Sequence, residues 1–265
     1  MNILEKIIAN KRVELQKNMT EIPVSSLRDQ PNYGRKTISL KESLGDTGKT
    51  GIIAEFKRMS PSKGVIHATA DVAQVTKAYT EHHAAGLSIL TDISFFGGSG
   101  ADLITARQHD IPILRKDFII DEYQIEEAKA LGADVILLIA ACLTTERTRE
   151  LAVYAKQLEM EVLLEIHNEE ELGHISEETE LVGINNRDLR TFTVDIDRSI
   201  QLGRQVPDNK IRIAESGIHS AAMVHLLRDA GFGGFLMGEK FMQEQDPGEA
   251  FRLFVKQLKI NYNEH

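Results

Sequence analysis

The chain has 265 residues, 42% of them hydrophobic, and a formal net charge of −9 at pH 7. This length is sufficient for one large hydrophobic core. The acidic balance argues against general nucleic-acid binding, which usually requires a basic surface, but a locally positive pocket for an anionic small molecule remains compatible with it. The single cysteine, Cys142, excludes an internal disulfide framework and is typical of a reducing compartment.

Residues 1–50 contain one helical pattern followed by a polar connector rich in glycine. Apolar residues recur in it at roughly helical spacing: Ile3, Leu4, Ile7, Ile8 and Leu15. The pattern differs from that of a signal or transit peptide, and no apolar run approaches the roughly 18 to 20 residues of a membrane span. We therefore expect a cytoplasmic protein whose N-terminal extension lies across the domain that follows.

From residue 51 to 258, short apolar runs alternate with longer segments of helical pattern. The predicted strands are 51–55, 87–91, 112–115, 134–139, 161–165, 181–184, 210–214 and 234–237. The predicted helices lie near 71–85, 100–108, 121–131, 144–158, 168–175, 196–203, 219–229 and 247–258. The strands are continuously apolar, which indicates a parallel sheet with both faces covered.

Eight strand–helix units in about 210 residues are typical of a (β/α)8 TIM barrel. An open doubly wound sheet is the alternative, but it usually has fewer units and a glycine-rich first turn. No G-x-G-x-x-G follows the first strand. We therefore predict an α/β protein with one barrel domain over residues 1–265, in which 1–50 are the N-terminal helical extension and 51–258 the barrel.

Charged and polar residues stand where the predicted strands end, which in a TIM barrel is the face that holds the active site. Glu55 and Lys57 are two residues apart at the end of the first strand, so both are expected to point inward while Phe56 points outward. The ends of other strands carry Lys116, Glu165, Asn185, Arg187, Glu215 and Ser216. A barrel interior holds so many polar groups only if they pair or meet a ligand.

Other polar residues have a simpler interpretation. A lone lysine or glutamate at a strand end is more often a solvated charge than a functional one. His167 and the pair His82-His83 lack metal-ligand spacing and are interpreted as surface or capping residues. Cys142 is interpreted as a small packed residue. The functional prediction therefore depends on the convergence of strand ends, not on any one residue.

Two turns containing glycine predict a phosphate site. Ser216-Gly217 follows the seventh strand and Gly238-Glu239 the eighth, and these are the loops that bind phosphate in many TIM barrels. Glycine lets the backbone approach phosphate oxygens closely. The carboxylate of Glu239 is compatible with a phosphate only if its side chain turns away and its N–H faces the ligand.

The chain resembles the indole-3-glycerol phosphate synthase family over nearly its whole length, from ILEKIIANKR onward. The matching segments, in order, are IIAEFKRMSPSKG, LSILTD, FFGGS, ILRKDFIIDEYQI, GADVILLIAA, LLEIHNEEEL, VGINNRDL, IAESGI and GFLMGEKFM. The resemblance implies conversion of 1-(2-carboxyphenylamino)-1-deoxyribulose 5-phosphate to indole-3-glycerol phosphate, carbon dioxide and water, as a carboxy-lyase of tryptophan biosynthesis. It also implies that no cofactor or metal is needed.

The resemblance further implies a role for each matching residue. It implies Lys116 as general acid and Glu165 as general base, with Lys57 and Glu55 as an ion pair that positions the substrate. The remaining implied residues are Asn185 and Ser216 at the reaction centre, Ser60 and Arg187 at the substrate carboxylate, the backbones of Gly217, Gly238 and Glu239 at the phosphate, and Glu215 in the polar shell around Lys57. Lys240 stands where the family usually has a small or neutral residue.

The implied chemistry adds two expectations. Burial and neighbouring groups should lower the pKa of the acidic lysine, and whether Lys57 or Lys116 is the acid in each step does not follow from the sequence. Apolar walls around the substrate's aromatic ring are expected from Phe95 or Phe96, Phe118 and Leu138.

Two alternative functions are a Schiff-base aldolase acting on a phosphorylated sugar and a barrel that binds a ligand without turnover. We expect a monomer, because the sequence shows no obvious apolar surface patch.

Overall fold

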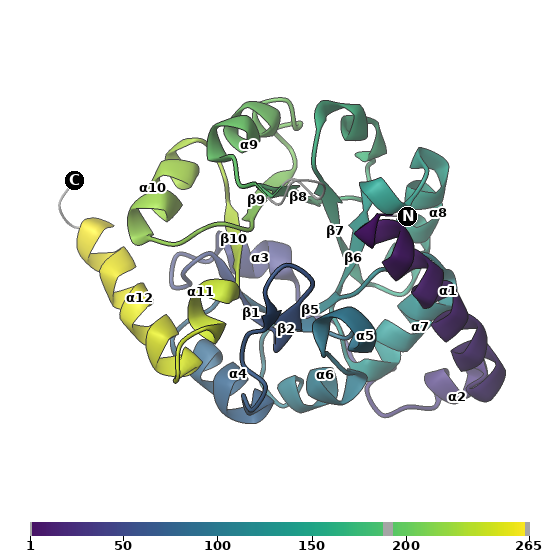
Figure 1. Ribbon diagram of the computed structural model, residues 1–265. Coiled ribbons are helices and arrows are strands. Elements are labelled where there is room, and N and C mark those ends of the chain that lie inside the picture. The colour runs from purple at the N-terminus through teal and green to yellow at the C-terminus, as the bar shows by residue number, and fades with distance from the viewer. Residues whose placement is uncertain (1, 188–192, 263–265) are drawn as a thin grey trace.

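The computed structural model describes residues 2–187 and 193–262, and its centre is a closed barrel of parallel strands (Figure 1). Around the barrel the strand order is β1-β10-β9-β8-β7-β6-β5-β4. The strands are β1 (Ile52–Phe56), β4 (Gly86–Leu90), β5 (Ile113–Lys116), β6 (Val135–Ile139), β7 (Glu161–Ile166), β8 (Leu181–Asn185), β9 (Ile211–Glu215) and β10 (Gly234–Met237). The predicted TIM barrel is confirmed, and each strand end lies within one residue of its predicted position.

Helices surround the barrel as an outer ring (Figure 1). They are α4 (Val72–Glu81), α6 (Gly100–Ala106), α7 (Glu122–Leu131), α8 (Thr145–Gln157), the 3₁₀ helix η2 (Glu169–His174), α9 (Ile196–Gly203), α10 (Ala221–Asp229) and α12 (Pro247–Tyr262). Several begin at a capping side chain: Asp71, Thr144 and Asn168 each accept a hydrogen bond from a backbone N–H of the first turn. Every predicted helix is therefore present, although the one near 168–175 is a 3₁₀ helix.

Four short elements in the loops were not predicted. They are α5 (Ile93–Phe96), η1 (Ala140–Cys142), α11 (Glu239–Met242) and a hairpin of β2 (Met59–Ser60) with β3 (Gly64–Val65). Segments of two to four residues are too short to show a periodic apolar pattern, so sequence periodicity cannot reveal them.

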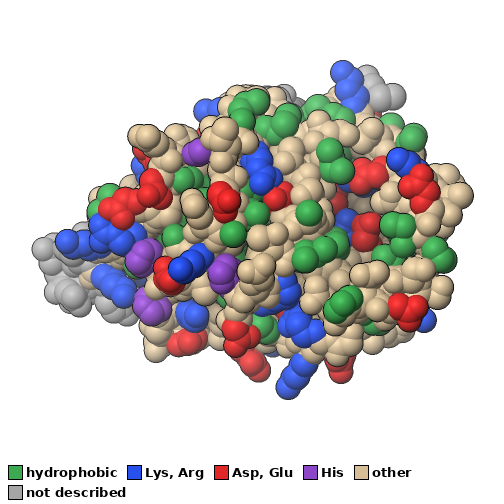
Figure 2. Space-filling model, turned by 90° about the horizontal axis from the view of Figure 1, so that it is seen from below, with side chains coloured by type: hydrophobic (Ala, Val, Ile, Leu, Met, Phe, Trp, Pro, Cys, Tyr) green, Lys and Arg blue, Asp and Glu red, His purple; other side chains and the backbone are tan. Residues whose placement is uncertain are grey.

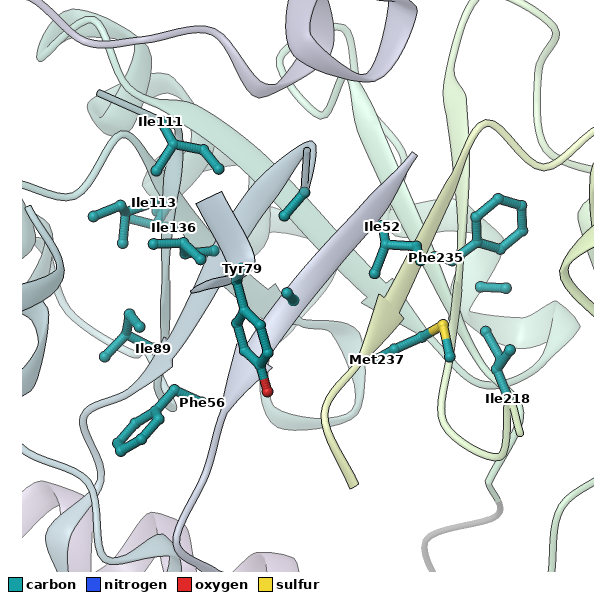
Figure 3. Close-up of a cluster of buried hydrophobic side chains, with 14 of the residues drawn as sticks. Ile52, Phe56, Tyr79, Ile89, Ile111, Ile113, Ile136, Ile218, Phe235 and Met237 are labelled. Atoms are coloured by element: carbon teal, nitrogen blue, oxygen red, sulfur yellow. The ribbon is translucent and has the colours of Figure 1, made fainter. Parts of the chain in front are cut away.

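The core has two layers because the side chains of each strand alternate between the inside and the outside of the barrel. Ile53, Leu137 and Leu163 belong to the cluster that fills the barrel interior. Ile52, Phe56 and Tyr79 belong to the larger cluster between strands and helices (Figure 3). Phe56 therefore points outward as predicted, which requires its neighbours Glu55 and Lys57 to point inward.

The segment before β1 forms three helices, α1 (Ile3–Glu21), α2 (Val24–Arg28) and α3 (Leu40–Gly45), where the sequence predicted one. Leu40 of α3 is 1% exposed and belongs to the cluster inside the barrel. Helix α1 begins with a capping box, in which Asn2 and Glu5 bond to each other's backbone N–H. Its Lys11 is buried against Asp92, which follows β4, and Asp117, which follows β5.

A search of the helices within the described residues finds none that is both long and apolar enough to cross a membrane. The longest, α1, carries charged residues along its length, among them Lys6, Lys11 and Glu14. It packs on the barrel through a few buried positions, such as Ile7.

Candidate active site

A cavity of about 200 Å³ opens at the ends of the strands. Of the predicted site residues, thirteen line it: Glu55, Lys57, Ser60, Lys116, Phe118, Glu165, Asn185, Arg187, Glu215, Ser216, Gly217, Gly238 and Glu239. Phe96 also lines it, and Phe95 does not. Side chains separated by more than 180 residues in the sequence thus meet in one place, because parallel strands present their carboxyl ends at the same face of the barrel.

The expectation for Leu138 is wrong. Leu138 lies in the outer cluster against the helices, whereas Leu137 and Ile139 line the cavity. Ile139 is paired in register with Glu165, so the two side chains share the inner face of the barrel. The run VILLI is apolar at every position, and only its pairing with β7 shows which residues face inward.

Lys116 and Glu165 form the centre of the cavity. Lys116 Nζ lies 3.0 Å from Glu165 Oε2. The other carboxylate oxygen, Oε1, accepts a hydrogen bond of 3.0 Å from Asn185 Nδ2. Burial alone would favour a neutral Glu165, but Lys116, His167 and Asn185 outweigh it and hold the pKa of Glu165 well below its usual range. The site therefore contains a cationic acid candidate in contact with an anionic base candidate.

The charge state of Lys116 differs from the expectation. Burial acts to lower its pKa, but Glu165, Glu215 and Glu55 together act more strongly and raise the pKa of Lys116 above its ordinary value. These carboxylates come from three different strands, β7, β9 and β1. Lys116 is therefore an ammonium ion at neutral pH and carries the proton that a general acid must donate.

Glu215 lies deep in the barrel, where a glycine on the neighbouring strand makes room for it. A Cβ at Gly183 would collide with Glu215 Oε1, so any other residue at this position of β8 would displace the Glu215 carboxyl group. Burial and the negative charge of Glu165 raise the pKa of Glu215 to about 8. Lys116 Nζ is 3.7 Å from Glu215 Oε2. Glu215 is accordingly neutral near pH 7. The Lys116 ammonium therefore does not face three full negative charges from Glu55, Glu165 and Glu215.

Lys57 and Glu55 form the predicted ion pair, with Nζ 2.8 Å from Glu55 Oε1. Ser88 of β4 donates a longer hydrogen bond, 3.4 Å, to the other oxygen of Glu55. A Cβ at Gly238 would lie 2.7 Å from Glu55 Cβ, so the glycine that follows β10 also accommodates this pair. Lys57 is thereby held beside Glu55 on the cavity wall, whereas Lys116 contacts Glu165.

The cavity rim carries Arg187, whose guanidinium points toward two partners. It donates to Ser62 Oγ at 3.0 Å and to Glu239 Oε2 at 3.4 Å. Lys63 Nζ is 3.5 Å from the other oxygen of Glu239. The Glu239 carboxylate thus balances two cations that an anionic ligand could contact, while its own N–H begins α11 after Gly238.

Replacing Glu239 by glutamine should strengthen the binding of anions. The rim pairs are partly exposed, and such pairs contribute about 0.2 to 1 kcal/mol. We therefore expect Glu239→Gln to lower the KM for a phosphorylated substrate up to about fivefold with little change in kcat. Steady-state kinetics at low and high salt would measure this, and a raised KM would show that Glu239 assists binding by orienting Arg187.

The loop after β9 has an unusual backbone. Ser216 and Gly217 both adopt the left-handed region, with φ of 67° and 71°. A Cβ at Gly217 would collide with Val194. Successive residues of this kind can turn their N–H groups toward a common anion, and Asn186 Nδ2 holds the loop by donating 2.7 Å to Ser216 O. Strain at a residue other than glycine, here Ser216, is a frequent feature of ligand sites.

Sequence reasoning missed several residues of the site. Helix α1 contributes Ile3, Leu4 and Ile7 to the cavity wall, and nothing local in the sequence indicated this. His167 was interpreted as a surface or capping residue, yet its Nε2 lies 3.1 Å from Glu165 Oε1. The two-residue spacing that placed Glu55 and Lys57 on one face applies equally to Glu165 and His167, so this signal was available.

Known proteins that resemble this chain belong to the family that its sequence motifs indicated. A family model described as "Indole-3-glycerol phosphate synthase" matches residues 4–254. Curated relatives of that name include one from Bacteroides thetaiotaomicron, 48% identical over 97% of this chain and 99% of its own. Others come from Polynucleobacter asymbioticus, 44% identical over 94% and 97%, and Salinibacter ruber, 42% identical over 98% of each chain.

Solved structures with much lower identity share the fold alone. Tryptophan synthase subunit alpha from Legionella pneumophila is 12% identical with a TM-score of 0.61, covering 85% of this chain and 98% of its own. A chain of the tryptophan synthase complex from Pyrococcus furiosus is 14% identical with a TM-score of 0.59, covering 80% and 98%. The match over residues 4–254 and the 42–48% identity to full-length relatives show that this chain belongs to the indole-3-glycerol phosphate synthase family.

Proposed function

We propose that the chain converts 1-(2-carboxyphenylamino)-1-deoxyribulose 5-phosphate to indole-3-glycerol phosphate, the carboxy-lyase reaction of tryptophan biosynthesis. The observation that carries this proposal is the contact of 3.0 Å between Lys116 and Glu165 in a cavity rimmed by cations. The reaction needs a proton donor and a proton acceptor at one centre, and it needs positive charge for a carboxylate and a phosphate. The cavity supplies each of these.

Ring closure is the step assigned to Lys116. The ring carbon that bears the carboxylate attacks the ketone, and the ketone oxygen gains the electron pair and takes a proton from the Lys116 ammonium. Carbon dioxide then leaves, and the cationic nitrogen of the new ring system takes up the electrons of the broken bond. Glu165 removes a proton in the final dehydration, while the hydroxyl group takes a proton from one of the two lysines, Lys57 or Lys116, and leaves as water. General acid or base catalysis of this kind is worth about 10²- to 10⁴-fold per group.

The other predicted residues hold the substrate. Lys57, kept in place by Glu55, faces the cavity beside Lys116. We assign Ser60 and Arg187 to the substrate carboxylate, and the backbones of Gly217, Gly238 and Glu239 to the phosphate. Phe96 and Phe118, with ring centres 6.0 Å apart, offer an aromatic wall to the anthranilate ring. Asn185 and Ser216 complete the reaction centre.

A Schiff-base aldolase would need a neutral lysine as nucleophile. The raised pKa of Lys116 disfavours this, because the free amine is scarce at neutral pH. Borohydride added with the substrate should therefore leave the mass of the protein unchanged. An adduct on Lys116 or Lys57 would contradict the proposed mechanism.

The activity is tested directly with the purified chain. The carboxyphenylamino substrate should yield the fluorescence of indole-3-glycerol phosphate with release of one equivalent of carbon dioxide. Activity should persist after dialysis against a chelator, since the proposed steps use only protein side chains. If no indole product forms under these conditions, the proposed function is wrong.

The remaining expectations are part of the same proposal. We infer a cytoplasmic monomer that folds as one domain over residues 1–265 and does not bind nucleic acid. Figure 2 supports the last point, because acidic and basic side chains are interspersed on the face it shows and no continuous basic stripe crosses it. Sedimentation analysis would measure the mass of the particle.

A further inference from the structure

His167 is buried between two carboxylates, one of which is the predicted base. It follows strand β7, and its side chain is only 10% exposed. Nε2 lies 3.1 Å from Glu165 Oε1, within ion-pair distance but outside hydrogen-bond geometry. Nδ1 lies 3.2 Å from Glu171 Oε2 in hydrogen-bond geometry. Both ring nitrogens therefore face an acceptor, and only the doubly protonated imidazolium can satisfy both.

Glu171 is itself fixed in place, so it holds the ring. It accepts 2.7 Å from the His167 backbone N–H and 3.0 Å from Asn168 Nδ2. The resulting chain runs from Glu171 of η2 through His167 to Glu165 of β7. Histidines held by a carboxylate on the far nitrogen are a common device for fixing ring orientation and charge.

We propose that His167 is a positioning residue that keeps Glu165 ionised and oriented while Lys116 gives up its proton. This inference rests on the proposed roles of Lys116 and Glu165. Lys116 contacts Oε2 of Glu165, and its positive charge is lost when it protonates the ketone oxygen. The imidazolium at Oε1 then remains as the cation beside Glu165. His167 therefore keeps the base ionised after the acid has given up its proton.

The charged groups around His167 and Glu165 favour an imidazolium at His167. Burial acts to lower the pKa of His167, but Glu165 and Glu171 outweigh it and raise the pKa to about 10. Charged and titratable groups from five elements pack against Glu165 and His167: Lys116 of β5, Glu215 of β9, Glu171 of η2, Cys142 of η1 and Arg198 of α9. Arg198 donates a hydrogen bond of 3.3 Å to the His167 carbonyl oxygen. Among the residues that the structure describes, Lys116 and His167 are the cations in contact with the Glu165 carboxylate.

The first test is the charge of the ring, measured without reference to activity. Of the nine histidines of the chain, one should remain doubly protonated above pH 8 in ¹H–¹⁵N spectra that detect imidazole nitrogens. That signal should be missing in His167→Asn and present in His83→Asn, a matched change at an exposed position. If every imidazole has lost its charge by pH 8, the proposal is overturned.

The second test is the pH dependence of kcat. Removal of a cation in contact with a carboxylate raises the pKa of that carboxylate by about one to three units. The acidic limb of the kcat profile should therefore move upward by at least about one pH unit in His167→Asn, and by less in Glu171→Gln. KM should change less than twofold, because His167 does not line the cavity. A purely structural role would lower the melting temperature and leave the acidic limb where it is, which would also overturn the proposal.

Discussion

Lys116→Met is expected to lower kcat by about 10³-fold while KM changes little. Lys116 touches the carboxylate of Glu165 at the centre of the cavity, and the loss of one general acid is worth about 10²- to 10⁴-fold. An interaction made mainly in the transition state appears in kcat and not in KM. Stopped-flow or steady-state fluorescence of the indole product would measure both constants.

The variant should still fold, because the structure leaves no unbalanced charge when the ammonium is removed. Glu165 keeps Asn185 and His167 as partners, and Glu215 is neutral near pH 7. The far-UV circular dichroism should match that of the unmodified chain, and Lys77→Met, at an exposed lysine of α4, should keep full activity. An unchanged kcat in Lys116→Met, with a large loss in Lys57→Met, would transfer the acid role to Lys57.

Lys11→Met is expected to lower the free energy of unfolding by about 3 to 5 kcal/mol. Lys11 is 1% exposed, and its Nζ lies 2.9 Å from Asp117 Oδ1 and 3.1 Å from Asp92 Oδ2. Removing one partner of a buried ion pair leaves the other charge without compensation, which is strongly destabilising. Methionine has a similar length and apolar stem, so the loss measures the charge. Guanidinium denaturation monitored by circular dichroism would give the difference.

The pH dependence of this cluster has a defined sign. Burial opposes the charge of Asp117, but Arg115 and Lys11 outweigh it and lower its pKa to about 2. The stability that Asp117 contributes is therefore present above its unfolded pKa, near 4, and is lost as the pH falls toward 2. In Lys11→Met part of this dependence should disappear. Lys17→Met, on the exposed side of the same helix, is the matched control, and an equal effect of the two changes would contradict the cluster's role.

The barrel and most of its candidate active-site residues could be predicted from the sequence, because the sequence patterns that indicate them are local. Continuous apolar runs mark strands covered on both faces, and eight of them alternating with helical patterns suffice for the barrel. Once the barrel is predicted, the carboxyl end of each strand can be assigned to the active face, and this assignment needs no information about side-chain packing. Thirteen of the fourteen predicted site residues consequently line one cavity.

Leu138 could not be placed in the same way. An apolar run without alternation does not reveal which side chains face inward, and the register of β6 with β7 is a tertiary property. The same holds for Ile3 and Ile7 of α1, which reach the cavity from a helix that precedes the barrel. Their amphipathic spacing predicts a packed helix but not the surface on which it packs.

The amino-acid sequence by itself thus determined the order of the elements, the barrel and the residue types at each strand end. Only the tertiary structure decided the charges of those residues. Lys116 is cationic because the carboxylates of Glu165 and Glu55 lie near it, and Glu215 is neutral because it is buried and close to Glu165. His167 is cationic because it lies between Glu165 and Glu171. A pKa depends on burial and on charges a few ångströms away, and these distances exist only after distant parts of the chain have come together.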